Sequence, residues 1–97
     1  MPALPPPVTV LSCLVTPSVN SRQANGIEIS FVNAGTGVLH HVTFEVGYHT
    51  IDADIARTVN DTGSFAPGVR IDHHFDEFAG VSWLGGATTS CVATDAD

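Results

Sequence analysis

The chain has 97 residues, of which 43% are hydrophobic and 13% are charged, and its formal net charge at pH 7 is −7. This length suits one domain, and the hydrophobic fraction is too high for a disordered chain. The chain has ten acidic residues but only three arginines and no lysine, which argues against binding to nucleic acid or to an anionic membrane surface. No hydrophobic run is long enough for membrane insertion as a helix.

Residues 2–7 contain four prolines. Such a segment favours an extended polyproline conformation, so we expect residues 1–7 to form a stiff N-terminal arm. The rest of the chain, residues 8–97, is predicted to fold as a single β-sandwich domain. No signal peptide is visible at the N-terminus, so export of the protein requires a signal that was removed.

The first strand is predicted at residues 8–16. If Cys13 faces inward, alternation places Val8, Val10 and Leu14 on the opposite face. A monomer would expose this apolar row to water, so we predict that it is an edge for assembly. In the alternative interpretation, residues 76–86 cover the row from within the chain.

The central stretch, residues 26–48, shows two apolar runs of period two around a linker of small residues at 33–37. Period-two alternation is typical of strands with one buried face. Small residues tolerate the positive φ angles of tight turns, so the stretch is predicted to be a β-hairpin. The residues expected on its buried faces are Ile27, Ile29, Phe31, Val38, Val42, Phe44 and Val46.

Three further strands are predicted after this hairpin, at residues 55–65, 69–75 and 88–94. Ala66-Pro67-Gly68 is a strong turn signal between the first two of them. Residues 76–86 could hold a short helical turn or another strand. Six or seven short strands with regular turn signals favour an all-β fold, an antiparallel immunoglobulin-like β-sandwich.

Cys13 and Cys91 are the only cysteines, and they lie near the two ends of the chain. Their spacing matches no zinc or redox motif, so we predict one disulfide bond between the first and last strands. Disulfide bonds persist in oxidising compartments, which predicts an extracellular or cell-surface protein. The alternative is two unrelated buried thiols.

Four of the five histidines form two adjacent pairs. Alternation places His40 and His73 on inner faces and His41 and His74 on outer faces. One histidine from each pair could bind a metal if the two strands were neighbours, with Asp72 or Asp76 as a third ligand. We favour hydrogen-bonded or solvated histidines instead, so no metal or other cofactor is predicted.

Other chemical signals in the sequence are weak. No serine lies in a G-x-S-x-G motif, and the protein is predicted not to be an enzyme. Trp83, with Tyr48 and Phe78, could form an aromatic platform for a sugar, or it could belong to the core. Asn60-Asp61-Thr62 matches the N-glycosylation acceptor pattern and indicates a surface loop.

Residues 27–46, with Asn33-Ala34-Gly35, and the later turn Phe65-Ala66-Pro67-Gly68 resemble bacterial and archaeal immunoglobulin-like modules of the CARDB type. The resemblance covers about half of the chain. It implies a secreted, non-catalytic module that serves in adhesion, display or spacing.

Together these features predict an extracellular structural or adhesive module that self-assembles, as a homo-oligomer or beside other domains of a surface filament or multidomain surface protein. Sandwiches have open strand edges, which soluble proteins usually protect with charge, above all lysine, and this chain has none. The alternative function is a monomeric ligand-binding module for a carbohydrate or a divalent metal. A hydrolase is the third hypothesis.

Overall fold

The computed structural model describes residues 6–17, 23–51, 54–81 and 87–97. These residues form strands and turns but no helix, so the described chain is all-β, as predicted. Its strands are β1 (Val8–Pro17), β2 (Ala24–Asn33), β3 (Leu39–His49), β4 (Asp54–Phe65), β5 (Arg70–Phe75) and β6 (Thr88–Ala96). Residues 77–80, after β5, form turns. Within the described ranges, no helix is long and apolar enough to cross a membrane.

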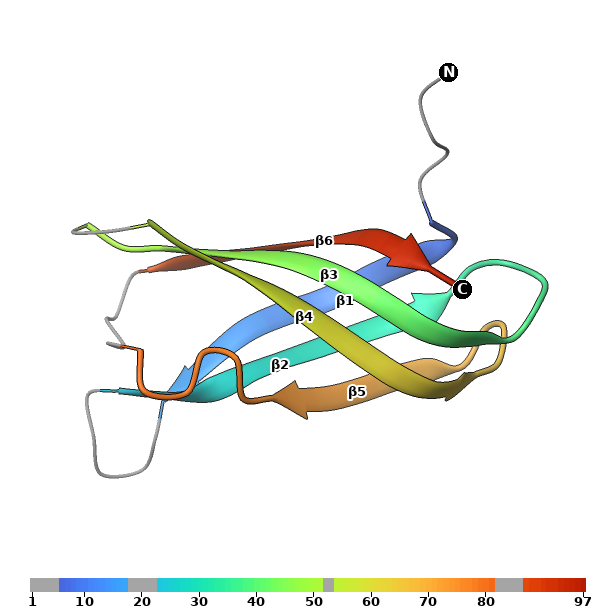
Figure 1. Ribbon diagram of the computed structural model, residues 1–97, viewed down its shortest axis with the longest axis horizontal. Helices are drawn as coiled ribbons and strands as arrows, with labels where there is room; N and C mark the ends of the chain where they lie inside the picture. Colours follow the sequence, from blue (N-terminus) through green and yellow to red (C-terminus); the bar gives the residue numbers. More distant parts are fainter. Residues whose placement is uncertain (1–5, 18–22, 52–53, 82–86) are drawn as a thin grey trace, which may run out of the picture.

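The strands form two antiparallel sheets, with the orders β1-β2-β5 and β4-β3-β6 (Figure 1). β2 and β3 follow each other in the chain but lie in different sheets. The predicted hairpin at residues 26–48 is therefore wrong, and residues 34–38 cross from one layer to the other. The crossing sets the apolar faces of β2 and β3 against each other, so that each face buries its partner.

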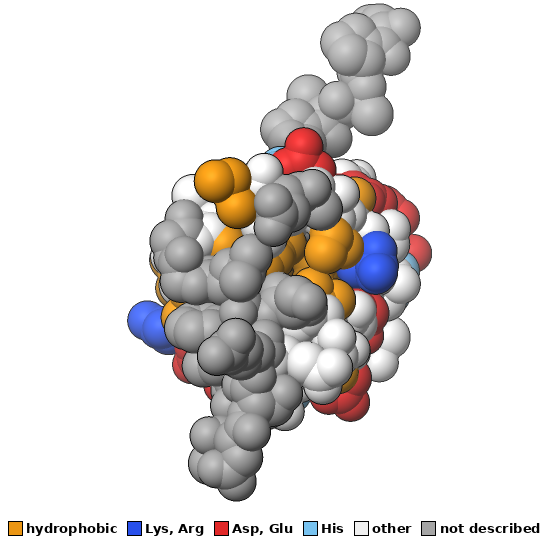
Figure 2. Space-filling view, turned by 90° about the vertical axis from the view of Figure 1, so that its left-hand side faces the viewer, with side chains coloured by type: hydrophobic (Ala, Val, Ile, Leu, Met, Phe, Trp, Pro, Cys, Tyr) orange, Lys and Arg blue, Asp and Glu red, His pale blue; other side chains and the backbone are white. Residues whose placement is uncertain are grey.

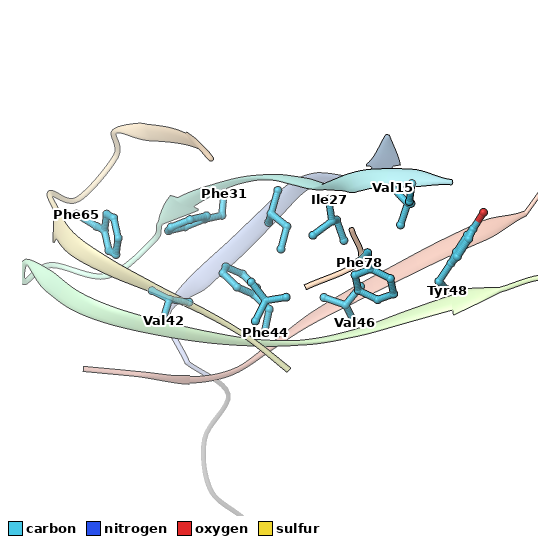
Figure 3. Close-up of a cluster of buried hydrophobic side chains, with 12 residues drawn as sticks. Val15, Ile27, Phe31, Val42, Phe44, Val46, Tyr48, Phe65 and Phe78 are labelled. Atoms are coloured by element: carbon cyan, nitrogen blue, oxygen red, sulfur yellow. The ribbon is translucent and has the colours of Figure 1, made fainter. Parts of the chain in front are cut away.

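The two sheets enclose one hydrophobic core, to which β2 and β3 contribute most (Figure 3). The Phe31 ring lies 5.2 Å from the Phe44 ring and 5.3 Å from the Phe65 ring, measured between centroids. Burial of one such side chain contributes about 1.5–3 kcal/mol. The inward residues of β2 and β3 are at most 1% exposed: Ile27, Ile29, Phe31, Val42, Phe44, Val46 and Tyr48.

Asn33 fixes the crossing from β2 to β3. Its side chain is buried, and its Nδ2 donates to the carbonyl oxygens of Gly37 at 2.7 Å and Phe65 at 2.9 Å. Its Oδ1 accepts from the Gly35 N–H at 2.9 Å. The positive φ angles expected in this linker are absent, since among the described residues they occur only at Gly26, Gly68 and Gly80. Hydrogen bonds from one buried amide hold the crossing instead.

The two sides of the sandwich are closed by different contacts. On one side His73 of β5 reaches across the layers, and its Nδ1 lies 2.6 Å from Oδ2 of the buried Asp61 in β4. On the other side the disulfide bond Cys13–Cys91 joins β1 to β6, with 6.1 Å between the Cα atoms. The structure thus pairs the two cysteines, as predicted, and it links the two sheets through their first and last strands.

Candidate functional site

The side of the sandwich formed by β1 and β6 has two free strand edges. In the described chain, β1 pairs only with β2, and β6 pairs only with β3. Apart from Val15, which is buried in the core, the inward apolar residues of β1 and β6 are only partly buried, whereas most of those of β2 and β3 are almost fully buried. The partly buried set comprises Val8, Val10, Cys13, Cys91, Ala93 and Ala96. The predicted assembly edge lies on this side.

A β-bulge at Leu11 changes the alternation along β1. Val10 pairs with Phe31 and Ser12 with Ser30, so Leu11 is the extra residue. Such a bulge reverses the faces on either side of it. Val8 and Val10 therefore pack against the core, and their predicted place on an outward apolar row with Leu14 is wrong. The exposed apolar residues of β1 are Leu14, at 61%, and Leu11, at 47%.

The β1 strand also lacks charge. No charged side chain occurs from residue 6 to residue 17. The other edge strands each carry charge, for example Arg57 in β4, Asp72 in β5 and Asp95 in β6. Because charge on an edge strand is a common barrier to pairing with another chain, β1 is the least protected edge in the described structure.

A second feature is a polar hollow of about 420 Å³ on the outer face of the β1-β2-β5 sheet, which we call the polar basin. In its floor Ser30 Oγ donates a hydrogen bond to Asp72 Oδ1, and Arg70 Nε donates to the same oxygen at 2.9 Å. Ser12, Ser30 and Asp72 are cross-strand neighbours. The basin is lined by Ser12, Glu28, Ser30, Arg70, Asp72, His73 and His74.

Asp72 is the one group in the described chain whose pKa clearly departs from its ordinary value. The hydrogen bond from Ser30, followed by that from Arg70, lowers the pKa of the Asp72 carboxyl group below 3.8. Both donors favour the ionised form. One contact across the sheet, from Ser30, and one along β5, from Arg70, thus account for the lowered pKa of this carboxyl group.

The histidines suggested as metal ligands do not come together. His41 lies on β3 and His74 on β5, which belong to different sheets. His41 Nε2 lies 3.0 Å from Asn60 Oδ1, whereas His74 lines the polar basin with Asp72. The proposed sharing of one metal by His41, His74 and Asp72 is therefore wrong. Among the described residues no group of three or more His, Cys, Asp or Glu side chains is arranged to hold a metal.

The inner placement of His40 was also wrong. His40 is exposed, and its Nδ1 lies 3.2 Å from the carbonyl oxygen of Gly63. The pairing of β3 with β4 shifts between Leu39 and His41, so His40 does not continue the inward alternation. Asn60 and the rest of its acceptor pattern lie within β4 rather than in the predicted loop.

His49 links Asp54 and Ser90 in the order of a hydrolase triad. Its Nδ1 lies 2.9 Å from Asp54 Oδ1, and its Nε2 lies 3.5 Å from Ser90 Oγ. Gly47 leaves the space between them, since a Cβ there would lie 3.0 Å from both His49 Nε2 and Ser90 Oγ. However, the Asp54 and His49 side chains are 79% and 49% exposed. Water competes for such contacts, and we read the group as cross-strand pairing.

Sequence reasoning missed the polar basin, because its residues come from three strands that are distant in the chain. The alternation of Glu28, Ser30 and Asp72 with apolar residues was the available signal for an outer face. Trp83, suggested as a sugar platform or as a cover for β1, lies outside the described residues, as does most of the predicted arm at residues 1–7. Phe78 is described and packs in the core, 6.2 Å from the Tyr48 ring.

Comparisons of the chain with models of protein families, with curated proteins and with solved structures gave no match. The strand edge of β1 and the polar basin are therefore the features from which a function can be inferred.

Proposed function

We propose that this protein is an extracellular, non-catalytic structural module that associates with copies of itself through a strand edge. The observation that carries the proposal is the free edge of β1, which has no charge from residue 6 to residue 17 and exposes Leu11 and Leu14. A free edge of this kind is a template for pairing with another chain.

The strand order supports an immunoglobulin-like assignment. In that fold strands A, B and E share one sheet, strands C and F share the other, and an added strand C′ can lie beside C. The observed orders β1-β2-β5 and β4-β3-β6 correspond to A-B-E and C′-C-F. This correspondence agrees with the resemblance to CARDB-type modules, which serve as adhesive or spacing units.

The disulfide bond supports a location outside the cytoplasm. Cys13–Cys91 is the covalent link between the two sheets, and such links persist where the environment is oxidising. A structural module at a cell surface, in a filament or in a larger surface protein, would be in such an oxidising environment.

Sedimentation velocity over a range of protein concentrations tests the proposal. We expect the weight-average mass of the oxidised protein to rise with concentration from one chain toward at least two. The increase should persist at high ionic strength, because the β1 edge contains no charge. A single species of one chain at all concentrations would contradict the proposal, and ligand binding at the polar basin would then be the leading function.

A further inference from the structure

We infer that two copies of this chain pair antiparallel through residues 12–16 of β1, around a twofold axis close to Leu14. The inference builds on the proposed function and names its partner, symmetry and contact. It follows from the regularity of this segment, from its lack of charge and from the exposure of Leu14.

Residues 12–16 are the regular part of β1. Their pairing with β2 runs without interruption from Ser12↔Ser30 to Thr16↔Gly26. The bulge at Leu11 bends the strand before this segment, and Pro17, which has no N–H to donate, ends it. The free edge therefore offers five consecutive extended residues, which is the usual length of a strand in a sheet.

The charge distribution favours a second copy as the partner. Each chain carries a formal charge of −7, so two copies repel each other wherever acidic side chains meet. Contact at β1 reduces this repulsion, because residues 6–17 contain no charged side chain and the nearest carboxylate on the sheet, that of Glu28, lies one strand behind Leu14. A neutral edge also offers no charge by which to select a basic partner, whereas its row of N–H and C=O groups complements itself when rotated by a twofold axis.

The pairing joins the two β1-β2-β5 sheets into one continuous sheet. On a twofold axis near Leu14, this residue lies opposite its own copy, and Ser12 lies opposite Thr16. Leu14 is 61% exposed in one chain, so the pair buries apolar surface that each chain alone shows to water. Leu11, exposed at 47%, lies beside this contact.

Charge exchange at Leu14 tests the inference. In L14K and in L14E, like charges meet across the axis, and we expect self-association to weaken about tenfold or more in each variant alone. In an equimolar mixture of the two variants opposite charges meet, and association should return to at least the wild-type level. V69K is the matched control, because Val69 is 50% exposed and lies outside the strands; its association should change less than about twofold.

Hydrogen exchange of the wild-type protein gives a second test that requires no variant. Amide protection in residues 12–16 should rise between low and high protein concentration, while that of β4 and β5 stays constant. If the wild type never associates, the proposed function fails. Three other results would leave the proposed function standing but show that this pairing is wrong. The mixture of L14K and L14E could fail to regain the association of the wild type, or V69K could weaken association as much as L14K. Amide protection could also rise at β6 instead of at residues 12–16.

Discussion

At the scale of single residues, buried polar side chains set how the strands fit together. Each forms a bond to a residue far away in the chain: Ser30 to Asp72, Asn33 to Phe65 and Asp61 to His73. A buried polar group left without a partner costs about 1–3 kcal/mol. These contacts therefore oppose any slip of β2 against β5, or of one layer against the other. Among the residues whose burial is described, the buried polar ones are Ser30, Asn33 and Asp61.

Asp72 gives a prediction at this scale. Because the Ser30 hydrogen bond is the main cause that lowers the pKa of the Asp72 carboxyl group, S30A should raise that pKa toward the ordinary value. Measurement of the Asp72 side-chain carbon shift against pH by NMR checks this in both proteins. S12A is the control, since Ser12 lines the same basin but is not a cause of the shift.

The same shift predicts how stability depends on pH. A carboxyl group with a lowered pKa in the folded state stabilises the protein above its unfolded pKa, here 3.8, and this contribution is lost as the pH falls through the folded pKa. The difference in unfolding free energy between the wild type and D72N should therefore shrink below pH 3.8. An S30A titration identical to that of the wild type would rule out this account.

At the scale of elements, the local pattern predicted the strands but not their partners. The alternation in residues 27–31 and 42–46 predicted which face of each strand is buried, and the structure confirms that these faces lie in the core. The same alternation suits a hairpin and a crossing between sheets equally well, because both bury one face. The choice depends on contacts such as Asn33 to Phe65, which lie 32 residues apart.

Bulges explain the errors at the candidate site. The extra residue Leu11 reverses the faces of Val8 and Val10 relative to Cys13, and the shift at His40 displaces that side chain from the inner face. Bulges depend on how two strands follow the twist of a sheet, which sequence periodicity does not contain. The exposure of Leu14 was predicted correctly because it lies after the bulge, on the same regular segment as Cys13.

Removal of the covalent link between β1 and β6 should greatly reduce the stability of the folded protein. The bond joins residues 78 positions apart, and closing a loop of this length contributes about 4.5 kcal/mol in the chain-entropy model. C13S/C91S should lose stability of this order in denaturant unfolding. As a check on the bond itself, the mass of the wild type should rise by two hydrogens upon reduction. Two thiols that react in the unreduced, unfolded protein would disprove the link.

At the scale of the whole molecule, net acidity opposes association. Acidic side chains recur around one end of the sandwich, where basic side chains are few (Figure 2). Repulsion between two such molecules acts over about 10 Å at moderate ionic strength. The neutral β1 edge allows contact, but the remaining surfaces still carry like charge, so the affinity should respond to net charge.

Acidification should therefore strengthen self-association. Protonation of all five histidines would change the formal charge from −7 to −2, by −7 + 5. Light scattering and sedimentation should show more association at pH 5 than at pH 8, and high salt should reduce the difference. Equal association at pH 5 and pH 8, measured at low salt, would show that charge repulsion between the chains does not limit their affinity.

The bond between Cys13 and Cys91 also determines how the protein responds to mechanical load. It joins the first strand of one sheet to the last strand of the other, so a pull on the chain from both sides passes from one cysteine directly to the other. The 77 residues between the cysteines, 91 − 13 − 1, are shielded from the force. Tension therefore passes through a short covalent path, and the strand pairs between the two cysteines stay unloaded even if residues 8–12 and 92–96 peel away from their neighbouring strands.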